Sequence, residues 1–229
     1  MNFSDPNFIF IFLPCSLFFF YFIKKYFRIN KFLLSTILIS SIIFYAINPF
    51  LYLILFFGSI LINFIFVKIM LYMNLKKFKI SRALILIFIV SLNLSALIYF
   101  KFMLLDVNPL TISRNLNDTG NIILPLGISF YTFQQIALQV DCYWKKVDTI
   151  NFLEYSSFIS FFPQLIAGPI VFQKEMIPQF NSMVDRNLTN QLIISGMLIF
   201  LIGLFKKTVF ADTIANGVDE VYLQLLNNS

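Results

Sequence analysis

The chain has 229 residues, of which 59% are hydrophobic and only 12% are charged. Soluble domains are roughly 45–50% apolar and about one quarter charged, so this composition excludes a water-soluble globule. The net charge of +6 does not indicate nucleic-acid binding, because the basic residues form short clusters at the ends of apolar runs, where they are typical of cytoplasmic anchors. We therefore predict an all-α protein whose helices cross a lipid bilayer several times.

Seven apolar segments predict helices at about residues 8–23, 32–47, 50–73, 83–105, 122–140, 152–172 and 188–210. These long continuous runs suit membrane helices of about 20 residues and do not fit the alternating strands of a β-barrel. Asn48 and Pro49 predict a tight turn, because proline cannot continue a helix. Residues 106–121 form the one clearly polar loop. With no internal repeat or low-complexity linker, we predict a single transmembrane domain over residues 1–229.

The distribution of charge predicts the orientation of these helices. The loops at 24–31 and 74–82 each carry four Lys or Arg residues and no acid. The turn at 48–49 is uncharged, and the loop at 106–121 has one Arg against two Asp. Because loops rich in Lys and Arg stay in the cytoplasm, the N-terminus is predicted to lie outside it.

A polar set interrupts the fifth segment, LPLGISFYTFQQIALQVD. At 100° per residue, Tyr131, Gln134, Gln135 and Gln139 fall within roughly 140° of arc, and Asp141 closes the segment. Amide side chains inside a bilayer are costly unless they find partners or face water. The helix alone leaves two alternatives open: an interhelical hydrogen-bond seam, or the wall of a polar cavity.

Helix breakers interrupt the sixth segment, in which SSFISFFPQLIAGPIVF is apolar yet contains Pro163, Gly168 and Pro169. Each proline removes a backbone donor and exposes a carbonyl. Non-helical backbone at membrane depth is tolerated only where it is buried in protein or lines a watery cavity. We predict a kinked or re-entrant element that lines an internal pocket or tunnel; the alternative is a proline kink that merely fits its neighbours. The tunnel candidates are Tyr131, Gln134, Gln135, Gln139, Asp141, Pro163, Gln164, Gly168 and Pro169.

Residues for catalysis are missing from this sequence. Histidine, the commonest general base near neutral pH, is absent, and the serines have no base nearby in sequence. There is no glycine-rich phosphate loop and no cluster of metal ligands. Cys15 and Cys142 indicate neither a disulfide nor a metal pair. We therefore assign no catalytic residue, no bound cofactor and no metal to the chain.

Two stretches carry a resemblance to a known family. ILPLGISFYTFQQIALQVDCYWKK and NFLEYSSFISFFPQLIAGPIVFQKEMIPQF look like the central signature of the membrane-bound O-acyltransferases, and resemble most the bacterial branch typified by alginate O-acetyltransferase. FSDPNFIFIFLP, IFYAINP, LIYFKF and LIGLFKKTVFADTIANGVDEVY extend the resemblance over nearly all of the chain. The D-alanyl transferases of teichoic acid synthesis are the next relatives.

This resemblance implies a ring of helices around a tunnel in the plasma (inner) membrane. It implies acetylation of the hydroxyls of an exported polysaccharide, as in alginate biosynthesis. An acyl donor, acetyl-CoA or a similar thioester, would enter from the cytoplasm and the acceptor hydroxyl from the far side. A histidine near the centre of the tunnel would act as the base on that hydroxyl. Periplasmic or extracellular acetylation proteins are the implied partners.

The chain also departs from the family pattern. The family's histidine lies in a Trp-His stretch downstream of the matching region, and Phe172 and Gln173 stand where many relatives carry a histidine after the GPI motif. The resemblance therefore implies an N-terminal half with an incomplete ring, from a truncated, frameshifted or split gene. The alternative is a non-catalytic membrane scaffold or a non-functional fragment of the same fold. A small transporter is disfavoured because no paired broken helix is present.

Overall fold

The computed structural model describes residues 3–47, 50–76, 79–105, 125–165, 168, 171–187, 189–215, 217–218 and 224. Four helices in this part of the chain are long and apolar enough to cross a membrane: Phe8–Tyr26, Leu51–Asn74, Arg82–Lys101 and Asn190–Ala215. The prediction of an all-α, polytopic membrane protein is confirmed. The predicted turn at 48–49, the polar loop at 106–121 and Pro169 lie outside the described residues.

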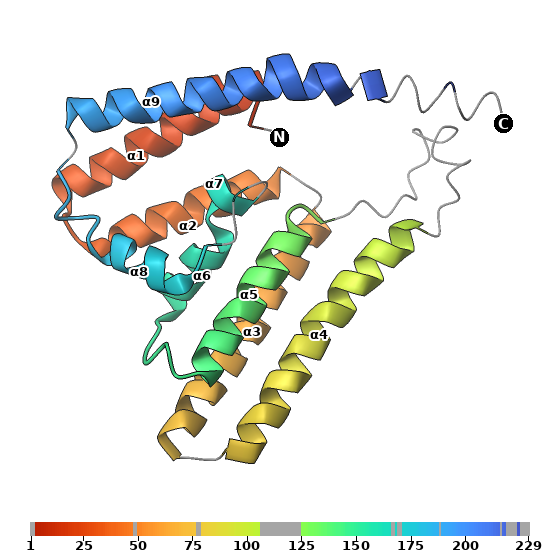
Figure 1. Ribbon diagram of the computed structural model, residues 1–229. Helices are drawn as coiled ribbons and strands as arrows, with labels where there is room; N and C mark the ends of the chain where they lie inside the picture. The colour runs from red at the N-terminus through yellow and green to blue at the C-terminus, as the bar shows by residue number, and fades with distance from the viewer. Residues whose placement is uncertain are drawn as a thin grey trace. The chain divides into compact units, whose positions relative to one another are not determined.

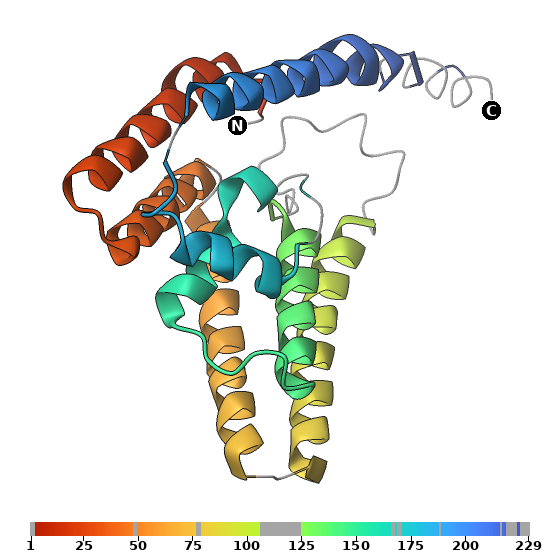
Figure 2. The ribbon, with the colours of Figure 1, turned by 60° about the vertical axis from the view of Figure 1, so that its left-hand side comes forward.

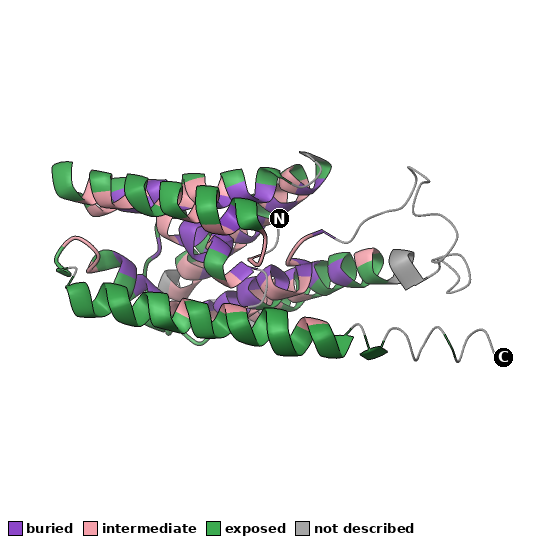
Figure 3. Ribbon diagram, turned by 90° about the horizontal axis from the view of Figure 1, so that it is seen from above, coloured by how far each residue is buried: buried purple, intermediate pink, exposed green. Residues whose placement is uncertain are grey.

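The helices divide into two units, and the first comprises residues 1–22 and 184–229. It holds the π-helix η1 (Phe8–Phe12), most of α1 (Leu13–Tyr26), α9 (Asn190–Phe205) and the π-helix η2 (Lys206–Ala211). No residue of α9 is buried, as the helix leading to the C-terminus in Figure 3 shows. An apolar helix without a buried face suits a lipid environment. That the chain forms a single transmembrane domain stays a prediction.

The second unit, residues 23–183, contains the remaining helices. They are α2 (Asn30–Ala46), α3 (Phe50–Lys76), α4 (Lys79–Leu105), α5 (Ile128–Tyr143), α6 (Phe152–Ser160), α7 (Phe162–Leu165) and α8 (Gln173–Asn181). Helices α3, α4 and α5 lie side by side, and α6 packs mainly against α2 (Figures 1 and 2). The first four predicted helices match the observed bounds to within a few residues. The sixth segment, predicted to be broken, is divided into α6 and α7, and α8 was not predicted.

A glycine turn sets the start of α5 at residue 128 instead of the predicted 122. Gly127 has a φ of +68°, in the left-handed region that side chains disfavour. A Cβ on Gly127 would lie 2.5 Å from the carbonyl oxygen of Leu165, at the end of α7. The hydroxyl of Tyr45 on α2 donates to the carbonyl of Leu126 at 2.9 Å. The start of α5 is thus held between α2 and α7, and only glycine fits the turn.

Candidate functional site

The amide side chains of α5 that were singled out in the sequence are all buried. Gln135 and Gln139 are 0% exposed, and Gln134 is 6% exposed. Their hydrogen-bond partners lie on α3 and α6. One of these partners, Asn63 of α3, also binds Asn93 of α4. The glutamines therefore face protein within the second unit.

The largest group of contacts is a polar seam, defined as Ser59 and Asn63 of α3, Asn93 of α4, and Gln135 and Gln139 of α5. Gln135 Oε1 accepts hydrogen bonds from Ser59 Oγ and Asn63 Nδ2, both at 2.9 Å. Asn63 and Asn93 pair reciprocally, each donating its Nδ2 to the other's Oδ1, at 3.1 and 2.8 Å. Gln139 Nε2 donates to the carbonyl of Asn63 at 2.9 Å. These are the contacts of an interhelical hydrogen-bond seam; that the face also lines a tunnel stays a prediction.

The break in the sixth predicted segment lies at Phe161, between α6 and α7. Phe161 has φ −52° and ψ +100°, so its carbonyl turns away from the helical direction. Pro163, two residues later, explains the break because its ring excludes the continuation of α6 and its nitrogen cannot donate. The new helix starts at once, since the carbonyl of Phe161 accepts from the amides of Gln164 and Leu165 at 3.0 and 3.1 Å.

Side chains from two other helices bind the backbone groups at this break. In a continuous helix the N–H of Phe162 would donate to the carbonyl of Phe158, four residues earlier. Here the Phe162 N–H donates to Ser41 Oγ of α2 at 3.2 Å. The Phe158 carbonyl accepts from Gln134 Nε2 of α5 at 3.3 Å. Ser41 in turn donates to the carbonyl of Ile37 at 2.9 Å, which fixes its hydroxyl as an acceptor for Phe162.

The end of α7 requires a second glycine. The N–H of Gly168 donates to the carbonyl of Gln164 at 3.0 Å. A Cβ at position 168 would lie 2.7 Å from the Cα of Gln164, which no real side chain tolerates. Of the predicted tunnel candidates, Pro163, Gln164 and Gly168 therefore form one local turn around the break.

Tyr131 and Asp141 lie apart from the polar seam. The Tyr131 ring packs 4.9 Å from that of Phe56, which in turn stacks on Tyr45 at 4.5 Å, so Tyr131 belongs to an aromatic core between α2, α3 and α5. Asp141, at the other end of α5, pairs with Lys146 at 3.1 Å. The predicted tunnel residues thus lie in four separate places: the aromatic core, the polar seam, the helix break and the ion pair with Lys146.

The C-terminal end of α5 is capped by side chains of α3 and α4. Asn74 Nδ2 donates to the carbonyl of Cys142 at 2.9 Å, and the guanidinium of Arg82 donates to the carbonyl of Tyr143. The Arg82 guanidinium also lies 5.0 Å from the centre of the Tyr143 ring. A cation at a helix C-terminus is stabilising because it complements the helix dipole. Arg82 therefore holds the C-terminal end of α5 next to the end of the 74–82 loop, which was predicted to be cytoplasmic.

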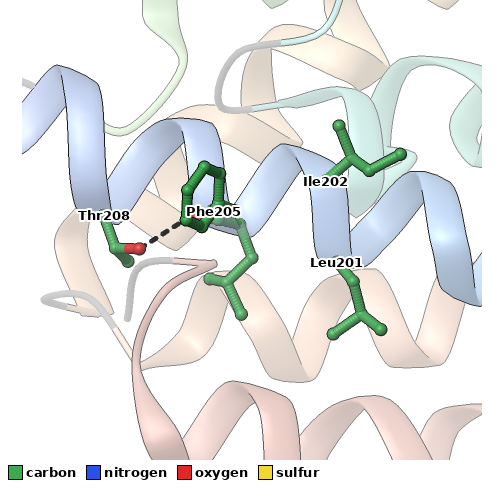
Figure 4. A pocket seen from close by; sticks show the side chains of 5 residues that line it. Leu201, Ile202, Phe205 and Thr208 are labelled. Atoms are coloured by element: carbon green, nitrogen blue, oxygen red, sulfur yellow. Dashed lines mark hydrogen bonds between the residues drawn. The ribbon is translucent and has the colours of Figure 1, made fainter.

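A hollow of about 510 Å³ lies on α9 and η2 of the first unit (Figure 4). It is lined by Leu201, Ile202, Leu204, Phe205 and Thr208. The one hydroxyl among these residues, that of Thr208, donates to the carbonyl of Leu204 at 2.9 Å. The hollow is therefore lined by apolar groups of α9 and η2, and its one hydroxyl is already bonded.

The chemistry of the site is hydrogen bonding without proton transfer. Amides and a hydroxyl make up the polar seam, and none of them titrates near neutral pH. Among the residues that the structure describes, no three His, Cys, Asp or Glu side chains come close enough to hold a metal ion. The predicted site residues did not include Ser41, Ser59, Asn63 and Asn93. Asn63 and Asn93 are amide side chains inside long apolar segments, where an amide is costly without a partner, and that placement is the signal that would have found them.

Comparison with known proteins identifies the family. Over 245 aligned residues the chain is 36% identical to a protein of Helicobacter pylori named "Peptidoglycan O-acetyltransferase", covering 95% of this chain and 46% of that protein. Proteins of Pseudomonas aeruginosa and Pseudomonas putida, both named "Probable alginate O-acetylase AlgI", are each 33% identical over 97% of this chain. These relatives are of the membrane-bound O-acyltransferase type, and the chain is similar to them over 95–97% of its own length. This confirms the resemblance carried by the sequence motifs.

The chain spans less than half the length of these curated relatives, covering 46%, 42% and 45% of the three proteins. Such coverage fits the N-terminal half of a membrane-bound O-acyltransferase that the motifs indicate. No protein-family model matches the chain. No solved structure matches it either.

Proposed function

We propose that this chain forms part of an O-acetyltransferase that acetylates hydroxyl groups of an exported polysaccharide. The observation that carries the proposal is the identity of 33–36% over 95–97% of the chain with relatives named for the O-acetylation of peptidoglycan or alginate. Both of these acceptors are glycans with free hydroxyls. The coverage of the relatives supports the N-terminal half, with the remainder of the machinery in a second half.

In this proposal the chain contributes scaffold and substrate path, and the base comes from elsewhere. A hydroxyl that attacks a thioester such as acetyl-CoA needs a base within hydrogen-bond reach, an effect typically worth about 10²–10⁴-fold in rate. The chain has no histidine, and its polar seam holds only neutral side chains. The second half therefore supplies the catalytic histidine, and the broken helix between α6 and α7 forms one wall of the tunnel.

The proposed function also implies a membrane and an orientation for the chain. The protein lies in the plasma (inner) membrane with its N-terminus outside the cytoplasm, so that the basic loop at 74–82 meets the cytoplasmic acyl donor. Periplasmic or extracellular acetylation proteins would take part on the far side. These assignments rest on the charge of the loops and on what the family implies.

The second candidate is a non-catalytic membrane scaffold with the same fold. The absence of histidine from all 229 residues is the observation that favours it. The two candidates differ in one respect that can be measured: a half enzyme gains activity when its missing half is supplied, whereas a scaffold does not.

The test is an acetyl-transfer assay with purified protein. The chain is incubated with acetyl-CoA and a soluble glycan acceptor, alone and after co-purification with the C-terminal half of the Helicobacter pylori relative. We expect ester formation in the mixture and none from the chain alone above a heat-treated control. Turnover by the chain alone would overturn the assignment of the base, and a co-purified but inactive pair would favour the scaffold.

A further inference from the structure

Two buried polar atoms of the seam have no hydrogen-bond partner among the residues that the structure describes. Gln135 Nε2 is a donor without an acceptor, and Gln139 Oε1 is an acceptor without a donor. Both side chains are 0% exposed. The residues are four positions apart on α5, so their side chains are neighbours on one face of the helix. An unpaired donor and an unpaired acceptor therefore lie one turn apart on the same buried face of α5.

The orientations of the amide groups that create this pattern are fixed by backbone carbonyls. Asn93 Nδ2 donates to the carbonyl of Ile89 at 2.8 Å, and Asn63 Nδ2 donates to the carbonyl of Ser59 at 3.0 Å. Turning either amide around would place an oxygen against a carbonyl oxygen. The asparagine orientations are therefore set. Asn63 Nδ2 shares its two hydrogens among three oxygens, and a nitrogen of Gln135 in place of Oε1 would put two donor groups 2.9 Å apart.

The same reasoning applies to the two glutamines. Gln135 must present Oε1 to Asn63, which leaves its Nε2 pointing away as a donor. Gln139 must present Nε2 to the carbonyl of Asn63, which leaves its Oε1 as an acceptor. Neither unpaired atom can be removed by exchanging the oxygen and nitrogen of its own amide, so the pattern does not depend on how the amides are assigned.

We propose that a single water molecule binds between Gln135 Nε2 and Gln139 Oε1 as a permanent member of the polar seam. Water accepts the hydrogen bond of the first amide and donates one to the second. Buried waters in proteins typically bind to polar groups that are otherwise unsatisfied, and both glutamines are fully buried. The site is independent of the proposed acetyl transfer, and it makes the polar face of α5 both a seam and a hydrated element.

The alternative is a direct hydrogen bond from Gln135 to Gln139, formed by a change of rotamer. This movement would pull Gln135 Oε1 away from Ser59 Oγ and Asn63 Nδ2, which hold it with two bonds of 2.9 Å. The direct bond and the water bridge differ in one observable, which is whether the Gln135 amide protons lie next to a water molecule.

The experiment measures cross-relaxation between water and the glutamine side-chain amides, by nuclear magnetic resonance of the full chain labelled with ¹⁵N-glutamine in lipid nanodiscs. Gln134 is the internal control, because it is adjacent and buried but its Nε2 is bound to the carbonyl of Phe158. We expect a water cross-peak at Gln135 at least fivefold stronger than at Gln134. Equal intensities, or no cross-peak at Gln135, would overturn the proposal and indicate the direct bond.

A variant tests the acceptor side of the site. Gln139→Leu removes the Oε1 that the water binds and should weaken the Gln135 cross-peak at least twofold. Gln191→Leu, at an exposed position on α9, is the matched control and should leave the cross-peak unchanged. An unchanged cross-peak in Gln139→Leu would contradict the bridging geometry. If this variant does not fold, the comparison of Gln135 with Gln134 in the unaltered chain remains decisive.

Discussion

Phe158 and Phe162 would share a backbone hydrogen bond in a continuous helix, but in this protein each is bound by a side chain from a different helix. Ser41 of α2 accepts from the amide of Phe162, and Gln134 of α5 donates to the carbonyl of Phe158. A backbone group left unpaired in a bilayer costs several kcal/mol. The two side chains thus let the chain break a helix inside the apolar region without that cost.

Removing either side chain should destabilise the second unit. Ser41→Ala and Gln134→Leu each leave a buried backbone group without its partner, which typically costs about 1–3 kcal/mol. Ser35→Ala is the control on the same helix, because the Ser35 hydroxyl only donates back to the carbonyl of Lys31. The free energy of unfolding, from denaturant titration in mixed micelles, measures the effect. Losses no larger than that of Ser35→Ala would show that the break does not depend on these contacts.

Gly127→Ala should be strongly destabilising. The left-handed conformation costs a non-glycine residue about 1–2 kcal/mol, and the new Cβ would meet the Leu165 carbonyl oxygen at 2.5 Å. Gly58 is the matched control, because it lies within α3 and a Cβ there has nothing within 4 Å. Gly58→Ala should stabilise the helix by roughly 0.5–1 kcal/mol. Thermal melts of the two variants should therefore shift in opposite directions, and equal shifts would contradict the glycine turn.

Asn63 and Asn93 should be energetically coupled. Each donates to the other, so removing one leaves the Oδ1 of the second without its donor. Double-mutant cycles of interhelical hydrogen bonds in membranes give about 0.6 kcal/mol on average and at most about 1.7. We expect a coupling in the upper part of this range for Asn63→Leu with Asn93→Leu, because the pair is reciprocal. Additive losses in the unfolding titration would contradict the pairing.

Most of the fold was predictable because helix length and apolar runs decide it. The spans around α2, α3, α4 and α9 follow from long apolar runs, because a helix needs about 20 apolar residues to cross the hydrocarbon core of a bilayer. The start of α5 did not follow, since the left-handed turn at Gly127 depends on Tyr45 and Leu165, far away in the sequence. Nor did α8, whose nine residues contain Pro178 and are too polar and too short for a membrane span.

Of the site, only the residues of α5 and the helix break were predictable from the sequence. The glutamines of α5 were visible as a polar arc in an apolar segment, and Pro163 indicated the break. Their partners Ser41, Ser59, Asn63 and Asn93 were not, because a lone polar residue in a membrane helix does not reveal which helix it faces. The family resemblance named the reaction class, which the hydrogen bonds of the described residues do not specify.

The orientation in the membrane can be tested by cysteine labelling of intact cells. Thr149 lies exposed in the loop after α5, and the capping of α5 by Asn74 and Arg82 places the end of that helix at the 74–82 loop. In a Cys15→Ser background, Thr149→Cys should react only after the membrane is permeabilised. Asn117→Cys, in the polar loop at 106–121, should react in intact cells because that loop is predicted to lie outside. The reverse pattern would place the N-terminus in the cytoplasm.

The central claim is that this chain works as one half of a polysaccharide O-acetyltransferase, and restoring acetylation in cells tests it most directly. A strain without its own peptidoglycan O-acetyltransferase receives this chain, the C-terminal half of the Helicobacter pylori relative, or both. The measurement is the acetate released by mild alkali from the isolated peptidoglycan. We predict acetate only when both halves are present, with a large loss for Gly127→Ala and little change for Gly58→Ala. Acetate from this chain alone, or none from two halves that co-purify from the membrane, would contradict the claim.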